Sequence, residues 1–216
     1  MAKFSKRFIR LIFGLFLYAL GIVMTINANI GYAPWDVFHV GLANSIGLSI
    51  GVASILTGVV IVLISWLLGE KLGLGTILNM LLIGVFLDII MALKVIPKLD
   101  HVILGIFMML GGLFVIALAS YFYIGAAFGA GPRDSLMVAL TRKTGLSVGI
   151  CRGSIELMAV IIGWRLGGKL GLGTILSALA IGFCVQMTFK WLKFDPRNVK
   201  HETLDKTFRW KTDEIS

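Results

Sequence analysis

Charged side chains are scarce in this chain of 216 residues: Asp, Glu, Lys and Arg make up 14% of it, against 58% hydrophobic residues. A soluble domain of this size needs more polar side chains than that to cover its surface. The mean hydropathy of +0.95 leads to the same conclusion. We therefore predict an integral membrane protein whose main partner is the lipid bilayer.

Cysteine is also rare. Cys151 and Cys184 both lie inside apolar runs, at a spacing that suits neither a disulfide framework nor a zinc site. The three histidines, His39, His101 and His201, are scattered along the chain. We therefore predict no metal and no cofactor. The sequence also lacks a nucleophile elbow and a paired-carboxylate motif, so we do not expect an enzyme.

Acidic residues are outnumbered: the chain has 11 Asp and Glu but 20 Lys and Arg, which gives a net charge of +9. Such an excess is found in nucleic-acid-binding proteins and also in membrane proteins. The positions of the basic residues distinguish these two classes. They lie almost entirely between the apolar runs and in the two tails. That distribution is typical of charges that orient a membrane protein, and we predict no nucleic-acid partner.

The apolar runs do not alternate with polar residues, and a transmembrane barrel would need many shorter segments. Six runs instead approach the length of about 20 residues that crosses a bilayer as a helix. The predicted fold class is all-α, with about six transmembrane helices. These spans cover 8–26, 48–68, 77–93, 102–124, 146–166 and 175–192.

The Lys and Arg residues predict how these spans are oriented. Fifteen of them lie on the side that holds both termini, four lie on the opposite side, and Arg152 stands inside a span. Loops rich in Lys and Arg stay on the cytoplasmic side of a membrane. Both termini are therefore predicted to be cytoplasmic.

Residues 27–90 and 125–188 are two copies of one sequence repeat, 98 positions apart and aligned without a gap. Within it, the run Lys71–Leu78 recurs unchanged as Lys169–Leu176. Each half holds three spans, which is an odd number, so the second copy must enter the membrane from the opposite face. We predict two inverted repeats, a ground plan of many transporters. The predicted domains are a first membrane repeat over 1–98, a second over 99–193 and a polar cytoplasmic tail over 194–216.

A Gly-x-x-Pro-x-Asp pattern follows the first span of each half, with Pro34 and Asp36 in one copy and Pro132 and Asp134 in the other. Proline suits the first position of a helix, and a carboxylate suits its first turn. Each pattern predicts a half-helix that is too short to cross a bilayer. The two half-helices either point their carboxylates into a central cavity, as broken helices do in carriers, or carry ordinary helix caps.

A Gly-x-Gly-Thr turn precedes the third span of each half. Its backbone amides allow an anion site with the threonines as N-caps. The spacing lacks the lysine of a phosphate-binding P-loop, and a tight connection between two spans is the favoured interpretation. The residues of the two turns are Gly73, Gly75 and Thr76, and Gly171, Gly173 and Thr174.

Ionisable residues inside predicted spans are costly and mark functional sites. Arg152 and Glu156 stand four residues apart in the fifth span, so they share a helix face and can neutralise each other. The first half has Ser54 and Gly58 at these positions, and the pair is therefore specific to one half. The alternative is a purely structural pair. The candidates for a substrate or ion pathway are Arg152 and Glu156 first, then Asp134, Asp36 and Asp88.

Gly149 and Gly153 form a Gly-x-x-x-Gly pattern in the same span. Such a pattern predicts that another helix packs closely against this surface. Packing within the bundle explains it without a second chain, so an oligomer is allowed but not implied.

Three stretches resemble one family: Phe8–Ile22, Ala28–Val37 and Gly73–Asn79. They are similar to the YczE/YyaS/YitT family of bacterial membrane proteins, over almost the whole chain up to the polar tail. The resemblance implies a multi-pass protein of the bacterial plasma membrane. Its members mostly lack an assigned activity, so no residue role carries over.

Two functional hypotheses remain. The first is a small secondary transporter or exporter that works by alternating access, with the inverted halves moving around a central site. The second is a non-transporting membrane factor that supports or anchors another protein. Substrate, direction and coupling ion are not readable from the residues.

Overall fold

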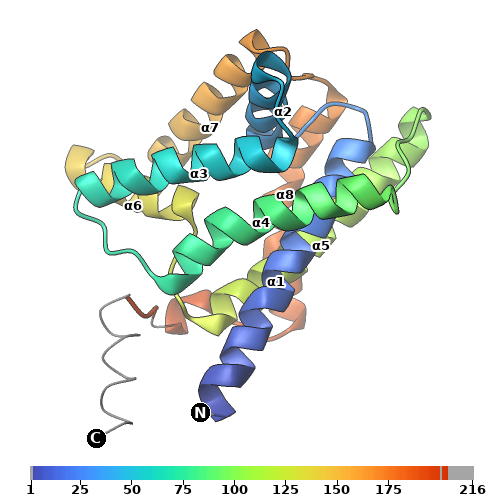
Figure 1. Ribbon diagram of the computed structural model, residues 1–216. Helices are drawn as coiled ribbons and strands as arrows, with labels where there is room; N and C mark the ends of the chain where they lie inside the picture. Colours follow the sequence, from blue (N-terminus) through green and yellow to red (C-terminus); the bar gives the residue numbers. More distant parts are fainter. Residues whose placement is uncertain (1, 200, 204–216) are drawn as a thin grey trace, which may run out of the picture.

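The computed structural model describes residues 2–199 and 201–203, and within them the chain is built from α-helices without strands (Figure 1). The all-α prediction is confirmed. A single 3₁₀ turn, η1, covers Pro196–Asn198, and most of the predicted polar tail, from residue 204 on, lies outside the described residues. The helices are α1 Ala2–Asn27, α2 Pro34–Ile46, α3 Ile50–Leu67, α4 Leu74–Leu93, α5 Val102–Ala126, α6 Pro132–Thr144, α7 Val148–Arg165 and α8 Leu172–Trp191.

Five of these helices, α1, α3, α4, α5 and α8, are long and apolar enough to cross a membrane. The remaining predicted span, the fifth, corresponds to α7, which has 18 residues but carries Arg152, Glu156 and Arg165. The chain is thus a multi-pass membrane protein. The count of six spans stays a prediction.

Two short helices begin at the prolines of the repeated Gly-x-x-Pro-x-Asp pattern. α2 starts at Pro34 and α6 at Pro132, and each has 13 residues. Each ends at a glycine in the left-handed conformation, Gly47 with φ 68° and Gly145 with φ 71°. Proline opens a helix at no cost, and glycine adopts positive φ without strain. Local sequence alone therefore sets both ends of these helices.

The helices repeat at the same interval as the sequence. α6, α7 and α8 begin and end 98 residues after α2, α3 and α4. α1 and α5 lie side by side through the centre of the bundle (Figure 1). Glycines permit this contact, because a Cβ at Gly21 would lie 2.8 Å from the carbonyl oxygen of Gly112. On either side of this pair, α4 packs on α1 and α8 packs on α5.

Each short helix packs against a helix of the other half. α2 contacts α7, where a Cβ at Gly41 would lie 2.3 Å from the Gly163 carbonyl oxygen. α6 contacts α3, and there the Arg142 guanidinium donates a hydrogen bond to the Leu68 carbonyl at 2.8 Å. The two halves are therefore interlocked rather than placed beside each other.

The repeated Gly-x-Gly-Thr turns account for part of this interlocking. The Gly75 N–H donates to the Phe128 carbonyl at 2.7 Å, just before α6. In the other copy the Gly173 N–H donates to the Ile30 carbonyl at 2.8 Å, just before α2. Each turn thus docks on the segment that leads into the short helix of the opposite half. The amides are used in this docking, which supports the interpretation as a structural connection.

The prediction that Thr76 and Thr174 are N-caps is wrong. α4 begins after Gly73 and α8 after Gly171, so both threonines lie inside the first turn. Their hydroxyls accept a hydrogen bond from the N–H of those two glycines, at 3.2 Å in each copy. The side chain therefore closes the helix start from the third position instead of the cap position.

α3 packs tightly on α4. A Cβ at Gly51 would lie 2.1 Å from the Gly84 carbonyl oxygen, so only glycine permits this approach. Gly149 and Gly182 occupy the same positions in α7 and α8, yet a Cβ at either would meet nothing within 4 Å. The close contact that we predicted for Gly149 and Gly153 is therefore absent in this conformation. The two halves share a sequence but differ at this contact.

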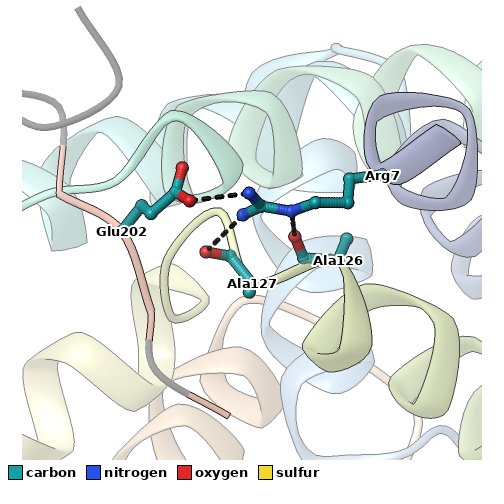
Figure 2. Close-up of polar contacts among 4 residues, drawn as sticks. All are labelled: Arg7, Ala126, Ala127 and Glu202. Atoms are coloured by element: carbon teal, nitrogen blue, oxygen red, sulfur yellow. Dashed lines mark hydrogen bonds and ion pairs between the residues drawn. The ribbon is translucent and has the colours of Figure 1, made fainter. Parts of the chain in front are cut away.

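Arg7 of α1 ties together the end of the bundle that holds the described parts of both chain ends, which we call the tail end (Figure 2). Its guanidinium donates to the carbonyls of Ala126 at 3.0 Å and Ala127 at 3.4 Å, where α5 ends. It also pairs with Glu202 at 2.6 Å and lies 4.5 Å from the centre of the Phe128 ring. A cation at the carboxyl end of a helix is favourable, and Arg7 thereby fixes the connection from α5 to α6.

We expect Arg7→Met to destabilise the protein by about 1–3 kcal/mol, because charge-assisted hydrogen bonds to two carbonyls are lost. Glu202→Gln should cost roughly 0–1 kcal/mol, because this ion pair is about one-third exposed and solvent screens it. Thermal unfolding of both variants in the same detergent checks the difference. Equal shifts in melting temperature would show that the ion pair, and not the carbonyl contacts, provides the stabilisation.

Candidate binding cavity

One cavity of about 360 Å³ lies among the helices and is lined by residues from all eight of them. Pockets of roughly 300–1,000 Å³ are usual for small-molecule ligands, and this one lies at the low end of that range. Its wall is mixed: Ile22 and Ile181 are apolar, while Asn79 and Ser120 are polar.

Much of the lining comes in pairs of residues 98 positions apart. The cavity therefore lies where the two copies of the repeat meet, and each copy contributes the same positions to it. Every charged residue of the lining comes from the second copy. The pairs are Tyr18 with Ile116, Ile22 with Ser120, Trp35 with Arg133, Ser54 with Arg152, Thr57 with Ile155, Gly58 with Glu156 and Ile83 with Ile181.

The starts of the two short helices meet in the cavity. The Arg133 guanidinium of α6 lies 4.4 Å from the centre of the Trp35 ring of α2, which is a cation–π contact. Both residues directly follow the prolines that open their helices. Sequence reasoning missed this pair, although the equal positions of the two residues in the repeat were available as a signal.

The two predicted carboxylates of the short helices differ in their surroundings. Asp134 lines the cavity and is exposed to it. Asp36 is buried behind it, where the Thr25 hydroxyl donates to its carboxylate at 3.5 Å and His39 Nδ1 lies 4.0 Å away. Within the described residues, neither carboxylate accepts a backbone N–H. The structure thus gives no sign that these residues act as helix caps.

Arg152 and Glu156 lie in the cavity wall and form the ion pair that their spacing predicts. Arg152 Nε donates to Glu156 Oε1 at 3.0 Å. The side chains remain 57% and 33% exposed, so the protein does not enclose the pair. An ion pair this exposed contributes little to folding, about 0–1 kcal/mol.

Asp88 is not part of the cavity lining. Its carboxylate accepts the Gly51 N–H at 2.8 Å and the Ser49 hydroxyl, and so it holds the start of α3 onto α4. The equivalent residues in the second half are Ser147, Gly149 and Gln186. Of the five predicted pathway residues, the structure brings Asp134, Arg152 and Glu156 together in the cavity, and it places Asp36 behind the wall and Asp88 at the α3–α4 contact.

A polar contact at the back of the cavity was also missed from sequence. The Tyr18 hydroxyl and the Ser120 hydroxyl lie 2.6 Å apart and connect α1 with α5. Both side chains stand within apolar runs that read as ordinary membrane helices, and nothing local distinguishes them.

Comparison with known proteins gives a family but no activity. The chain is 37% identical to the uncharacterised membrane protein YczE of Bacillus subtilis, over 81% of both chains. It is 34% identical to an uncharacterised protein of Haemophilus influenzae, over 82% of this chain and 80% of the other. The uncharacterised protein YyaS of Bacillus subtilis is 25% identical, over 81% and 88% respectively. No solved structure matches.

These relatives confirm the resemblance to YczE and YyaS, and they are proteins to which this chain is similar in sequence. A family model matches residues 5–190, which include every residue that lines the cavity. The chain belongs to the family of unknown function DUF6198.

Proposed function

We propose that this protein is a small secondary transporter of the bacterial plasma membrane that works by alternating access. Its substrate is a small molecule or ion that binds in the cavity between the two halves. Both termini are cytoplasmic, and the halves are inverted repeats around an axis in the membrane plane. In this class of transporter, binding sites lie at the interface of the repeats and use broken or short helices.

The observation that carries the proposal is that equivalent contacts differ between the halves. We call Ser49, Gly51, Gly84 and Asp88 the first gate, and Ser147, Gly149, Gly182 and Gln186 the second gate. The first gate is closed by glycine packing and by the Asp88 hydrogen bonds. Around the second gate, both glycines face open space. Two copies of one sequence that adopt different contacts are what alternating access requires of inverted repeats.

The side on which the cavity opens follows from this difference. When closed, the second gate would join the first turn of α7 to the second half of α8, and α8 leads directly into the predicted cytoplasmic tail. With cytoplasmic termini, the conformation described here is open to the cytoplasm. Exchanging the contacts of the two gates gives the outward-open conformation, in which α7 packs on α8 and α3 leaves α4.

Cysteine cross-linking tests the exchange. In a background with Cys151 and Cys184 replaced by alanine, we expect Ser147→Cys/Gln186→Cys to become cross-linked by a short thiol reagent, because the two residues meet when the second gate closes. Ser49→Cys/Asp88→Cys is the matched pair, and it should cross-link in the conformation described here, where the native side chains are hydrogen-bonded. Gel mobility after cleavage between the halves measures both.

A static protein would give a different result. If only the 49–88 pair cross-links, in native membranes and without detergent, the second gate does not close and the transport proposal fails. That outcome favours a membrane factor that supports another protein, because such a factor needs the fold but not the exchange.

A further inference from the structure

Two charged side chains that line the cavity form no ion pair within 4.0 Å among the described residues. The guanidinium of Arg133 rests on the Trp35 ring, and no carboxylate of the described residues lies within 4.0 Å of it as an ion-pair partner. A ring face offers a partial negative charge but accepts no conventional hydrogen bond. Arg133 therefore has N–H donors that can bind a ligand.

Asp134 is the second such group. Its carboxylate is exposed to the cavity, and among the residues with a described structure it accepts no hydrogen bond. Consecutive residues of a helix point in different directions, and Asp134 forms no ion pair within 4.0 Å with the neighbouring Arg133. On the first turn of α6, a negatively charged hydrogen-bond acceptor, Asp134, thus lies next to a positively charged hydrogen-bond donor, Arg133.

The other charges near the cavity are already matched. Arg152 and Glu156 form their own ion pair at 3.0 Å. The Asp36 carboxylate accepts a hydrogen bond from the Thr25 hydroxyl, and Asp36 does not line the cavity. What remains for a ligand is one positive and one negative group, set in a wall that is otherwise largely apolar on the side of Ile22, Ile116 and Ile181.

We infer that the cavity binds a small zwitterion, with the carboxylate of the ligand on Arg133 and its ammonium group on Asp134. This inference rests on the proposed function and names the substrate class of the same cavity. A guanidinium binds a carboxylate through two parallel hydrogen bonds, which favours Arg133 as the anion-binding group. A ligand with a single charge would bind one of these two groups and displace water from the other without giving it a hydrogen bond, and that is unfavourable.

The experiment is an equilibrium binding assay on the purified full-length protein in nanodiscs. The twenty common amino acids and glycine betaine are first screened by thermal shift. The best binder is then compared with two analogues, one lacking the ammonium group and one lacking the carboxylate. For L-leucine these analogues are 4-methylpentanoate and 3-methylbutylamine. We expect each to bind more weakly by roughly tenfold or more, as for the loss of one charge-assisted hydrogen bond.

Two variants of the protein separate a binding role from a structural one. Arg133→Gln should reverse the preference, so that the amine analogue binds better than the zwitterion. Asp134→Asn should make the carboxylate analogue the better ligand. A role in packing alone would weaken all three ligands equally and would not change their order.

Three outcomes would overturn the inference: no zwitterion of the screen binds, the wild type binds a singly charged analogue as tightly as the zwitterion, or the order of ligands is unchanged in both variants. The cross-linking result is independent of these. Gates that exchange without zwitterion binding would leave the transport proposal intact and refute the substrate class. Zwitterion binding with gates that never exchange would support the ligand class and refute the transport proposal.

Discussion

Gly182→Val is expected to leave the protein folded at wild-type abundance but unable to close its second gate. In the conformation described here, a Cβ at Gly182 meets nothing within 4 Å, so a valine is accommodated. In the exchanged conformation Gly182 takes the place of Gly84, whose Cβ would lie 2.5 Å from the Gly51 carbonyl oxygen. Overpacking of this kind costs about 1–3 kcal/mol, which shifts an equilibrium by roughly 5- to 150-fold.

The measurement is the rate of cross-linking of the 147–186 cysteine pair in membranes. It should fall by roughly 5- to 150-fold in Gly182→Val. Gly84→Val is the matched control at the equivalent position, and it should act in the opposite direction by opening the first gate and accelerating 147–186 cross-linking. If Gly84→Val and Gly182→Val both reduce abundance equally, the two glycines are ordinary packing positions and the gate assignment is wrong.

The helices with local signals could be predicted from the sequence. Pro34 and Pro132 open α2 and α6, and the glycines that close them have positive φ, because these residue types suit those backbone conformations at low cost. The same reasoning misplaced the start of α4. A threonine in the first turn reads as a cap, whereas Gly73 precedes the helix and the Thr76 hydroxyl folds back to it.

The contacts between the halves could not be predicted in this way. The pairing of Trp35 with Arg133 depends on how two copies of the repeat fold against each other, and neither residue has a local signal for it. The repeat does show which residues are equivalent, and residues near the axis between the copies tend to meet their own equivalents. Trp35 and Arg133 are such a pair, and both line the cavity.

The repeat also explains why the close helix contact predicted at Gly149 is absent from the structure. A Gly-x-x-x-Gly pattern states that a surface allows close packing, and it does not state in which conformation the packing occurs. In the described conformation the surface is open, while the equivalent Gly51 is packed. Under the proposed exchange of contacts, the sequence carries the packing signals of two conformations, and the structure displays one of them. Asp88 likewise holds α3 on α4 in the first half, while Gln186, the equivalent residue of the second half, makes no such contact in the described residues.

Glu156→Gln is expected to inactivate the protein with little effect on its stability. The Arg152–Glu156 pair is 57% and 33% exposed, so its loss should cost about 0–1 kcal/mol of folding free energy. In the cavity, however, the variant leaves Arg152 as an unpaired positive charge next to the bound substrate. Truncating one member of such a pair lowers affinity by roughly tenfold or more.

Untargeted metabolite profiling of cells and medium measures the effect even while the substrate is unidentified. A compound that is distributed differently between wild type and a deletion strain should return to the deletion pattern in Glu156→Gln at matched membrane abundance. Asp100→Asn is the control, since that carboxylate is exposed and lies outside the cavity lining. The double variant Arg152→Gln/Glu156→Gln separates the two roles of the pair. Since it restores charge balance, a purely structural pair would be rescued by it, whereas a pair that contacts the substrate would stay inactive while the protein remains folded.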